Sequence, residues 1–451
     1  MPRDTFTRRG WLAAVAAGLT AGCGGRSTST STSTPTSAST STSTPTAAAA
    51  DEVTAEASES FERGPGNCAL NSTSIADGTW PMPHHDPAGT NAAPASNGPT
   101  SFPLNERWTM SALESQVTFP VADGAYVYAV AANADAEGVP KSAVLCHDPR
   151  RNGEIQWRHK VDATPIGPPV VAGDGVYVPF GTREDARVVA VDRNDGSLLT
   201  EYGLPGRFVG GLATAGASLV VPTDQSYRVV DARTAGHCWS FTPNDVSGAT
   251  RRDRKIRAAA VGGEMAYVGT GYPDGAPTTD AGHLYAVDPS VSGVQWHAEM
   301  DGPVGRLAVA DEVVLATTGD GISGFDPADG TRLWQVVADA AVRPPTLAVA
   351  DGTAVYGTRR TLHGLDTATG EERWSLSFGV RGDVILVGDV LFAIGRADPT
   401  TQRILLVAVD AASGGVRWQQ EIYDPIVDVM AADGYLYATT TDGRLFAFTS
   451  I

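Results

Sequence analysis

One stretch is repeated along this chain: Gly364-Leu365-Asp366-Thr367-Ala368-Thr369-Gly370-Glu371-Glu372-Arg373-Trp374. Its skeleton is a small residue, an apolar residue and Asp, followed by Gly four positions and Trp eight positions after the Asp. Looser copies keep only part of the skeleton, and one of them has Thr200 in place of Trp. Repetition at a regular period is typical of repeat architectures. The motif positions are Asp148, Trp157, Asp192, Gly196, Asp231, Trp239, Asp288, Trp296, Asp326, Gly330, Trp334, Asp366, Gly370, Trp374, Asp410, Gly414 and Trp418.

The residues around each copy predict four short antiparallel strands. Apolar runs alternate with small-residue turns such as Asp351-Gly352, which supply the positive φ that tight hairpins need. The motif Asp can accept backbone N–H bonds within its own turn, and the Gly can adopt a left-handed conformation. From Asp148 to Asp410 the motif Asp residues are spaced at 44, 39, 57, 38, 40 and 44. This spacing predicts an all-β propeller built from four-stranded blades.

The two ends of the repeat region predict how the ring closes. Residues 105–108 resemble a fourth strand that lacks its first three, whereas residues 435–448 supply strands that lack a following Trp strand. Pairing these two ends completes one more blade and removes an exposed sheet edge. We therefore predict an eight-bladed propeller whose ring is closed by the N-terminal strand. Seven blades is the alternative if one blade is degenerate.

The repeated motif resembles that of the PQQ-like propeller repeats, a family that includes quinoprotein dehydrogenases and the lipoprotein BamB. The resemblance covers about residues 80–451, including Trp80-Pro81-Met82 in the lead-in segment. It implies the propeller fold, whereas it leaves function open because members with and without the cofactor share it.

A quinone enzyme of this family would hold the cofactor beside Ca²⁺, commonly between an adjacent Cys-Cys pair and a Trp. This chain has no adjacent cysteines. Seven of its tryptophans are assigned to outer strands, which leaves only Trp80, in the arm, and Trp11. We therefore expect no cofactor, and PQQ in particular is not expected.

The N-terminal residues predict export. Thr7-Arg8-Arg9 begins a twin-arginine signature, and a short apolar run follows and ends at Gly22-Cys23 in a lipobox-like sequence. We expect lipidation of Cys23; plain cleavage near Ala21, or none, is the alternative. The predicted domains are a signal peptide (1–23), a Ser/Thr-rich disordered stalk (24–66), an N-terminal arm (67–101) and the propeller (102–451).

The charge of the chain restricts its partners. The formal net charge is −18, and only three of the 33 basic residues are lysines. Such a surface stays hydrated in high salt, so we infer a halophilic source and a secreted lipoprotein of haloarchaeal type. An ordinary acidic extracellular protein is the alternative. The same charge argues against nucleic acid as a partner.

The cysteines and histidines give weaker signals. Cys146 is expected to be a buried small residue, and Cys68 could pair with either Cys146 or Cys238. His84-His85-Asp86 could bind a metal, but adjacent histidines on a Pro-rich arm are more often exposed to solvent, so no metal site is expected.

The long loops predict where partners dock. The longest connection between blades contains the only dense basic cluster of the chain, Arg251, Arg252, Arg254 and Lys255. A solvated charged loop is the ordinary interpretation, and a partner-facing loop is the functional one.

We therefore expect a monomeric, non-catalytic scaffold at the cell surface, anchored by lipid to the outer face of the cytoplasmic membrane and binding envelope proteins. A PQQ-dependent dehydrogenase and a sugar- or polymer-binding surface module are the alternatives.

Overall fold

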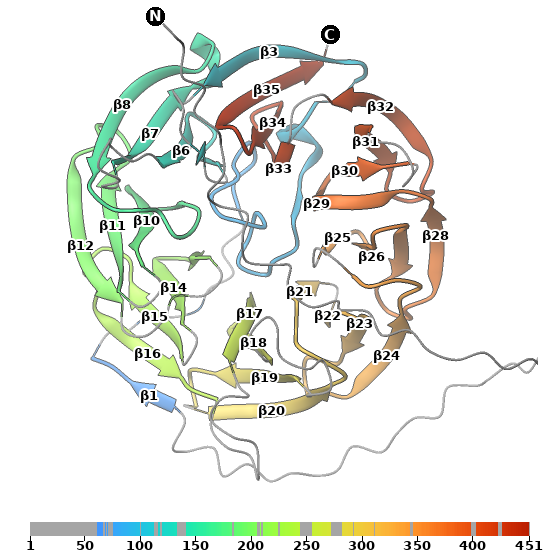
Figure 1. Ribbon diagram of the computed structural model, residues 1–451. Coiled ribbons are helices and arrows are strands. Elements are labelled where there is room, and N and C mark those ends of the chain that lie inside the picture. Colours follow the sequence, from blue (N-terminus) through green and yellow to red (C-terminus); the bar gives the residue numbers. More distant parts are fainter. Residues whose placement is uncertain are drawn as a thin grey trace, which may run out of the picture. The chain divides into compact units, whose positions relative to one another are not determined.

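The computed structural model describes residues 61–65, 68, 70, 75–99, 101–111, 116–117, 120–132, 141–182, 185–204, 208, 211–223, 226–243, 255–271, 282–291, 293–310, 312–342, 346–397, 403–422 and 426–450. These residues form eight sheets arranged around a central axis, each built on four antiparallel blade strands (Figure 1). The predicted eight-bladed propeller is confirmed. No helix in these residues is long and apolar enough to cross a membrane.

Blades 1 to 4 follow one another along the chain, each running from an inner strand to an outer one. Blade 1 contains β5 (Val121–Ala122), β6 (Val127–Ala132), β7 (Ser142–Asp148) and β8 (Glu154–Val161), and β4 (Gln116–Val117) also pairs with β6. Blade 2 contains β9 (Val170–Ala172), β10 (Gly175–Gly181), β11 (Ala186–Asp192) and β12 (Leu198–Leu204). Blade 3 contains β13 (Ala213–Ala215), β14 (Ser218–Pro222), β15 (Tyr227–Asp231) and β16 (His237–Phe241). Blade 4 contains β17 (Lys255–Gly262), β18 (Met265–Gly271), β19 (Gly282–Asp288) and β20 (Gly293–Met300).

Blades 5 to 8 complete the ring. Blade 5 contains β21 (Arg306–Ala310), β22 (Val313–Thr318), β23 (Gly321–Phe325) and β24 (Arg332–Val337). Blade 6 contains β25 (Ala348–Ala350), β26 (Thr353–Gly357), β27 (Leu362–Asp366) and β28 (Glu372–Leu376). Blade 7 contains β29 (Gly379–Val387), β30 (Val390–Arg396), β31 (Ile404–Asp410) and β32 (Val416–Ile422). Blade 8 contains β33 (Ile426–Ala432), β34 (Tyr435–Thr440) and β35 (Arg444–Ser450), and its outer strand is the N-terminal β3 (Leu104–Ser111).

The tryptophans connect neighbouring blades. Trp334 donates its indole N–H to the carbonyl of Thr367 at 2.9 Å, in the motif turn of the next blade. The Trp334 ring also packs against Gly370 of that turn. A Cβ added to Gly370 would lie 2.6 Å from the nearest atom of the ring, which is too close. Glycine is therefore required at this position for two reasons: the φ of 71° and the close approach of the ring. The same indole-to-carbonyl bond joins Trp108 to Pro149, Trp157 to Arg193, Trp296 to Pro327 and Trp374 to Ala411.

Two of the other seams are built differently. At the ring closure Trp418 stacks on Phe102, with 5.6 Å between the ring centroids. Between blades 2 and 3, Thr200 stands where other outer strands carry Trp, and the adjacent Leu198 and Leu199 are exposed. The apolar core lies between the blades, where side chains of neighbouring sheets interdigitate.

The chain before the propeller adds two further connections to blade 3. Strand β1 (Phe61–Arg63), at the end of the predicted stalk, pairs antiparallel with β16 as a fifth strand. Cys68 forms a disulfide with Cys238, with the Cα atoms 5.6 Å apart. Of the two pairings left open by the sequence, this selects Cys238. Cys146 is a buried free thiol.

Residues 75–99, the described arm, form a ring inside the ring of blades. They include β2 (Ala92–Ala93), which pairs parallel with β29, and the short 3₁₀ helix η1 (Ala95–Asn97). A second 3₁₀ turn, η2 (Pro149–Arg151), lies in blade 1. Arm carbonyls accept hydrogen bonds from inner strands in the order of the blades. The donor–acceptor pairs are Ala122 to Trp80, Val171 to Pro81, Val261 to Pro87, Val309 to Ala88, Val349 to Thr90 and Leu386 to Asn91.

The arm closes on itself at blade 8. The buried Asn97 side chain accepts from the backbone N–H of Gly78 at 2.8 Å and donates to the carbonyl of Thr79 at 2.7 Å. It also donates to Ala431 of β33 at 3.3 Å. The arm meets the inner strands just before their turns into the second strands, so it covers the axis on that side of the ring.

Candidate functional site

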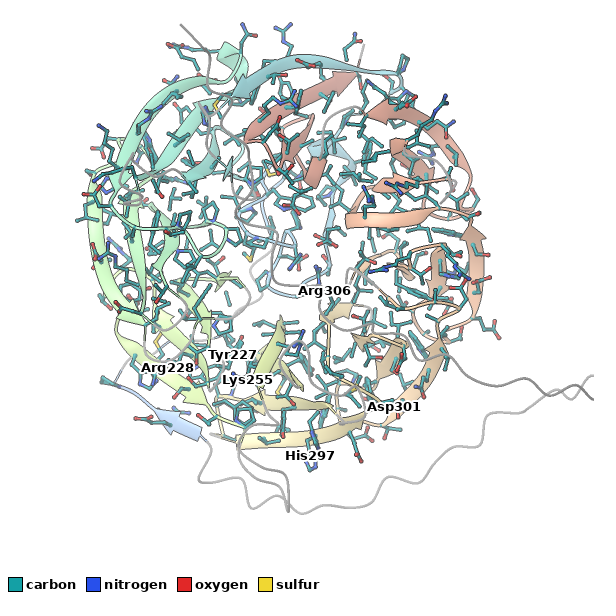
Figure 2. The ribbon with its side chains drawn as sticks, viewed as in Figure 1. Tyr227, Arg228, Lys255, His297, Asp301 and Arg306 are labelled. Carbon is teal, nitrogen blue, oxygen red and sulfur yellow. A yellow bond between two sulfur atoms is a disulfide. The ribbon has the colours of Figure 1, made fainter. Side chains whose placement is uncertain are left out.

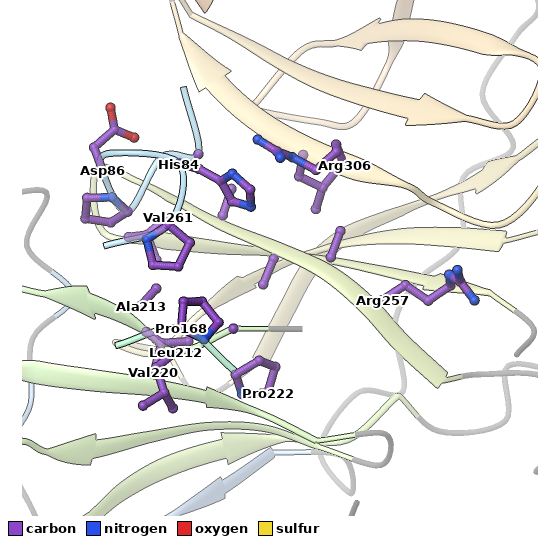
Figure 3. A pocket seen from close by; sticks show the side chains of 18 of the residues that line it. His84, Asp86, Pro168, Leu212, Ala213, Val220, Pro222, Arg257, Val261 and Arg306 are labelled. Atoms are coloured by element: carbon purple, nitrogen blue, oxygen red, sulfur yellow. The ribbon is translucent and has the colours of Figure 1, made fainter. Parts of the chain in front are cut away.

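A pocket of about 380 Å³ lies at the axis, with the arm as part of its lining. The remaining lining comes from inner strands and from the residues that lead into them. Because the arm covers the side of the first hairpin turns, the pocket opens toward the loops that join second to third strands and one blade to the next. Much of its lining is apolar, contributed by Pro168, Leu212, Ala213, Val220, Pro222 and Val261 (Figure 3).

One charged group that lines the pocket is Asp383. Its Oδ2 accepts from Arg306 Nη1 at 2.8 Å and lies 3.2 Å from His84 Nδ1. Its Oδ1 accepts from the backbone N–H of Val384 at 3.1 Å. Arg306 is buried, with 9% of its surface exposed, and lies near the axis in Figure 2. This cluster joins the arm to blades 5 and 7.

The surroundings shift the pKa values of this cluster. Burial would raise the pKa of the Asp383 carboxyl, but the charge of Arg306 and the hydrogen bond from His84 outweigh burial, so the pKa is lowered. Burial and the nearby Arg306 lower the pKa of His84, against the opposing effect of Asp383. His84 is therefore neutral at pH 7, and its Nδ1–H can donate to Asp383 while Nε2 stays an acceptor.

The arm holds His84 in an unusual backbone conformation. His84 and His85 have φ values of 66° and 72°, in the left-handed region that few non-glycine residues adopt. The His84 carbonyl accepts from the N–H groups of Asp86 and Asn91, both at 2.9 Å. Asn91 in turn donates its side-chain N–H to the Val384 carbonyl at 2.7 Å. Strained backbone held in this way is commonly found at functional sites.

The expectation that the two histidines face solvent is wrong for His85, whereas the His84 side chain keeps 40% of its surface exposed. His85 is only 4% exposed and packs edge-on against Trp80, with 4.9 Å between the rings. His84 contributes to the pocket. The two rings have different neighbours, since His84 contacts Asp383 and His85 packs on Trp80. Among the described residues, no group of three or more metal-ligating side chains could hold a metal ion.

Bulges in three inner strands accompany three charged residues of the pocket. The register of β17 with β18 shifts between Ile256 and Ala258, at Arg257. That of β29 with β30 shifts between Val380 and Val384, across Asp383. That of β33 with β34 shifts just before Asp428. A β-bulge re-aims side chains and is often found beside functional sites.

The residues of the pocket do not fit a quinone with Ca²⁺. Calcium takes about 6–8 oxygen ligands. The carboxylate oxygens of Asp383 are already bonded to Arg306, His84 and Val384. Both oxygens of Asp86 are bonded to Thr90. No tryptophan is among the described lining residues, and the disulfide of the described chain joins Cys68 to Cys238 rather than two neighbours.

The structure places the motif residues in turns and at blade seams rather than in the pocket. The Oδ1 of Asp366, for example, accepts from the N–H of Ala368 and Thr369 at 3.0 and 2.9 Å. Of the basic cluster, Arg251, Arg252 and Arg254 lie outside the described residues, as does Cys23, and Lys255 begins β17. The sequence reasoning did not select Arg306, Asp383 or Asp428. Each of these charged residues lies three positions before an inner-strand residue that contacts the arm. These contact residues are Val309, Leu386 and, in blade 8, Ala431, and this spacing was the available signal.

Comparisons with known proteins agree on the fold. The family profile described as "Outer membrane protein assembly factor BamB" matches residues 140–303 and 274–451. The serine/threonine-protein kinase AfsK of Streptomyces griseus is 33% identical over 119 residues, covering 24% of this chain and 14% of the kinase. AfsK of Streptomyces coelicolor is 33% identical over 105 residues, covering 22% of this chain and 13% of the kinase. The chain thus corresponds to only a small part of these kinases.

Solved structures with a similar fold include BamB and two dehydrogenases. BamB from Moraxella catarrhalis superposes with a TM-score of 0.54 at 16% identity, covering 77% of this chain and 98% of that one. A europium-containing methanol dehydrogenase has a TM-score of 0.59 at 12% identity, covering 82% and 98%. The quinohemoprotein alcohol dehydrogenase from Comamonas testosteroni has a TM-score of 0.60 at 15% identity, covering 83% and 81%. At these identities the likeness concerns the fold.

Proposed function

The chain belongs to the family of the outer membrane protein assembly factor BamB, and from this membership we propose that it is a non-catalytic scaffold that binds other proteins at the cell envelope. The observation that carries the proposal is the extent of the family match, which runs through residues 140–451 in two overlapping segments.

The architecture supports a scaffold. The indole bonds between blades, the disulfide between Cys68 and Cys238 and the closed arm each connect parts of the chain that are distant in sequence. A ring connected in this way holds its loops in fixed relative positions, and preorganised surfaces lose less entropy when a partner binds.

The donor set of the pocket supports a role without a quinone, since the carboxylates of Asp86 and Asp383 are bonded to protein groups. We propose that the protein works without PQQ. Purified protein would be incubated with PQQ and Ca²⁺ and assayed for dye reduction with alcohols. A bound quinone with alcohol-dependent reduction would overturn the scaffold proposal.

The partner-facing surface that we propose is the long-loop face, that is, the face of the loops that join second to third strands and one blade to the next. Arg251, Arg252, Arg254 and Lys255 are its basic element. The protein carries a net charge of −18, so a basic cluster stands out as a contact for an acidic surface. Reversing all four charges to Glu should remove partners recovered by cross-linking on intact cells. The matched control reverses four exposed basic residues of blades 1 and 8: Arg107, Arg151, Arg158 and Lys160. Equal recovery from both variants would count against this surface.

We further propose that the monomer is exported by the twin-arginine route and anchored through lipidated Cys23 to the outer face of the cytoplasmic membrane of a halophilic cell. Substitution of Cys23 by Ala should move the protein from the membrane fraction to the medium. Retention of the variant on the membrane would contradict the anchor.

A further inference from the structure

The axial pocket contains one carboxylate that the protein leaves without a hydrogen-bond donor. Asp428 follows the bulge in β33 and lines the pocket. Within the described part of the chain, no donor is bonded to its carboxylate, whereas Asp86 and Asp383 are both bonded. A partly buried carboxylate without a partner loses hydration without gaining a hydrogen bond, which is unfavourable.

Close backbone packing positions Asp428 beside Asp383. Gly382, in the bulge of β29, approaches the backbone of β33 so closely that a Cβ there would lie 2.7 Å from the Val427 carbonyl. The bulges of two neighbouring blades therefore contact each other beside Asp383 and Asp428. The arm turn with two left-handed histidines lines the same cavity.

We propose that this pocket binds a protonated primary amine on a short apolar stem, with Asp428 as the partner of the ammonium group. The ammonium supplies the donors that Asp428 lacks, and a charge-assisted bond of this kind is stronger than a neutral one. The apolar stem packs against the proline, leucine and valine side chains that also line the pocket (Figure 3). The cavity of about 380 Å³ has room for such a small amine.

The other charges of the pocket fit a cation at this end. Arg306 is neutralised by Asp383, and His84 is neutral because burial lowers its pKa. Arg257 lies at the end of the pocket away from His84 and Arg306 in Figure 3. An anionic ligand would instead be repelled by the ionised Asp428.

Protonation links the binding to pH. Burial and repulsion from Asp383 raise the pKa of the Asp428 carboxyl to about 6. An ammonium ligand favours the ionised carboxylate, so the affinity for an amine should rise as the pH increases from 5 to 7.5. Protonation of His84 at low pH acts in the same direction, because it adds a positive charge to the pocket. Asp86 and Arg257 are the remaining charged groups that line the cavity.

The amine has two possible sources, a free small molecule or a lysine side chain of a partner protein. The proposal is independent of the scaffold role, and titration calorimetry on the full chain tests it with defined probes. Benzylamine represents the free amine, an uncharged lysine-containing peptide with blocked ends represents the partner, and benzyl alcohol is the neutral control. We expect at least one amine to bind at least tenfold more tightly than benzyl alcohol at pH 7.5; which one binds identifies the source.

Substitutions separate a specific site from general apolar binding. Asp428→Asn should weaken amine binding at least tenfold, leave benzyl alcohol unchanged and remove most of the pH dependence. Asp301→Asn, which removes the same charge from an exposed carboxylate near the rim (Figure 2), should bind the amine as the parent does. Failure of both amines to bind at millimolar concentration, or equal amine binding by Asp428→Asn and the parent, would overturn the proposal.

Discussion

Trp374 donates its indole N–H to the backbone carbonyl of Ala411 at 2.8 Å, across the seam between blades 6 and 7. The motif Trp of one blade thus contacts the motif turn of the next. The repeated motif therefore builds the contact between neighbouring blades as well as the turn within each blade. Its residues therefore bear on stability, and the predictions below separate that role from binding.

Replacement of Trp374 by Ala should destabilise the protein by about 3–5 kcal/mol, as for other buried aromatic residues. The ring is 7% exposed, and its removal leaves both a cavity and an unpaired Ala411 carbonyl. Urea denaturation followed by tryptophan fluorescence measures the change. Binding at the long-loop face should be retained under native conditions, and its loss without a loss of stability would contradict the assignment.

Gly414→Ala should be more destabilising than Gly434→Ala. Both residues have positive φ, 71° and 81°, so each alanine costs about 1–2 kcal/mol for its left-handed backbone. Only at Gly414 would the added Cβ meet a ring, 2.7 Å from Trp374 Cδ2, whereas nothing lies within 4 Å of a Cβ at Gly434. The two free energies of unfolding, compared in the same denaturant series, test whether the ring contact is what demands glycine. Equal losses would show that backbone conformation explains the motif Gly.

Asn97→Leu should open the inner ring of the arm. The substitution removes the bonds to Gly78, Thr79 and Ala431, and each buried group left unpaired costs roughly 1–3 kcal/mol. We expect faster hydrogen exchange in residues 78–98 while the outer strands stay protected. The exposed Asn105→Leu serves as the control. Unchanged exchange in the arm would show that the backbone bonds to the inner strands suffice.

Loss of the disulfide should lower stability. The bond joins residues 170 positions apart, so its removal in Cys68→Ala is expected to cost about 3–5 kcal/mol by the loop-entropy argument. Reduction of the parent protein should reproduce the effect, and reductant should leave the variant unchanged. A parent protein whose unfolding is insensitive to reductant would contradict this prediction.

Two of the pocket carboxylates, Asp428 and Asp383, should give opposite pH dependences of stability. The pKa of Asp428 is raised to about 6, so its contribution is present below its unfolded pKa of 3.8 and is lost as the pH rises through 6. The pKa of Asp383 is lowered, so its contribution is present above 3.8 and is lost as the pH falls below that value.

Asp428→Asn should therefore be more stable than the parent at pH 7.5 by about 1–3 kcal/mol, taking 1.4 kcal/mol per pKa unit. The difference should vanish near pH 4. Thermal and urea unfolding at both pH values provide the measurement. A destabilised variant at pH 7.5 would mean that the ionised carboxylate has a favourable partner in the folded protein.

The sequence was sufficient to predict the blades because their signals are local. The turn chemistry of Asp366 and Gly370 and the ring of Trp374 lie within one short motif, and the motif recurs. The closure of the ring by residues 104–111 followed from an unmatched strand at each end. In contrast, Cys68 had two candidate partners, because pairing depends on where the arm runs.

The pocket could not be predicted because the contacts that build it are mostly backbone bonds and register shifts. The arm binds the inner strands through its carbonyl groups, which every residue has. A bulge such as the one before Asp428 has no sequence signature of its own. Arg306 and Asp383 interact across two intervening seams, so only the closed ring brings them together.

The closed arm also sets the order in which the molecule can be completed. Residues 78 and 79 lie near the start of the described chain, yet the bonds that fix them reach Asn97 and, through it, Ala431 of the last blade. The outer strand of that blade, β3, likewise precedes every blade but pairs with β35 at the C-terminal end. Contacts of such high sequence separation form late and slowly. A growing chain thus cannot pair β3 until β35 has been synthesised, and a product truncated before β33 would lack the final blade and the bond from Asn97 to it.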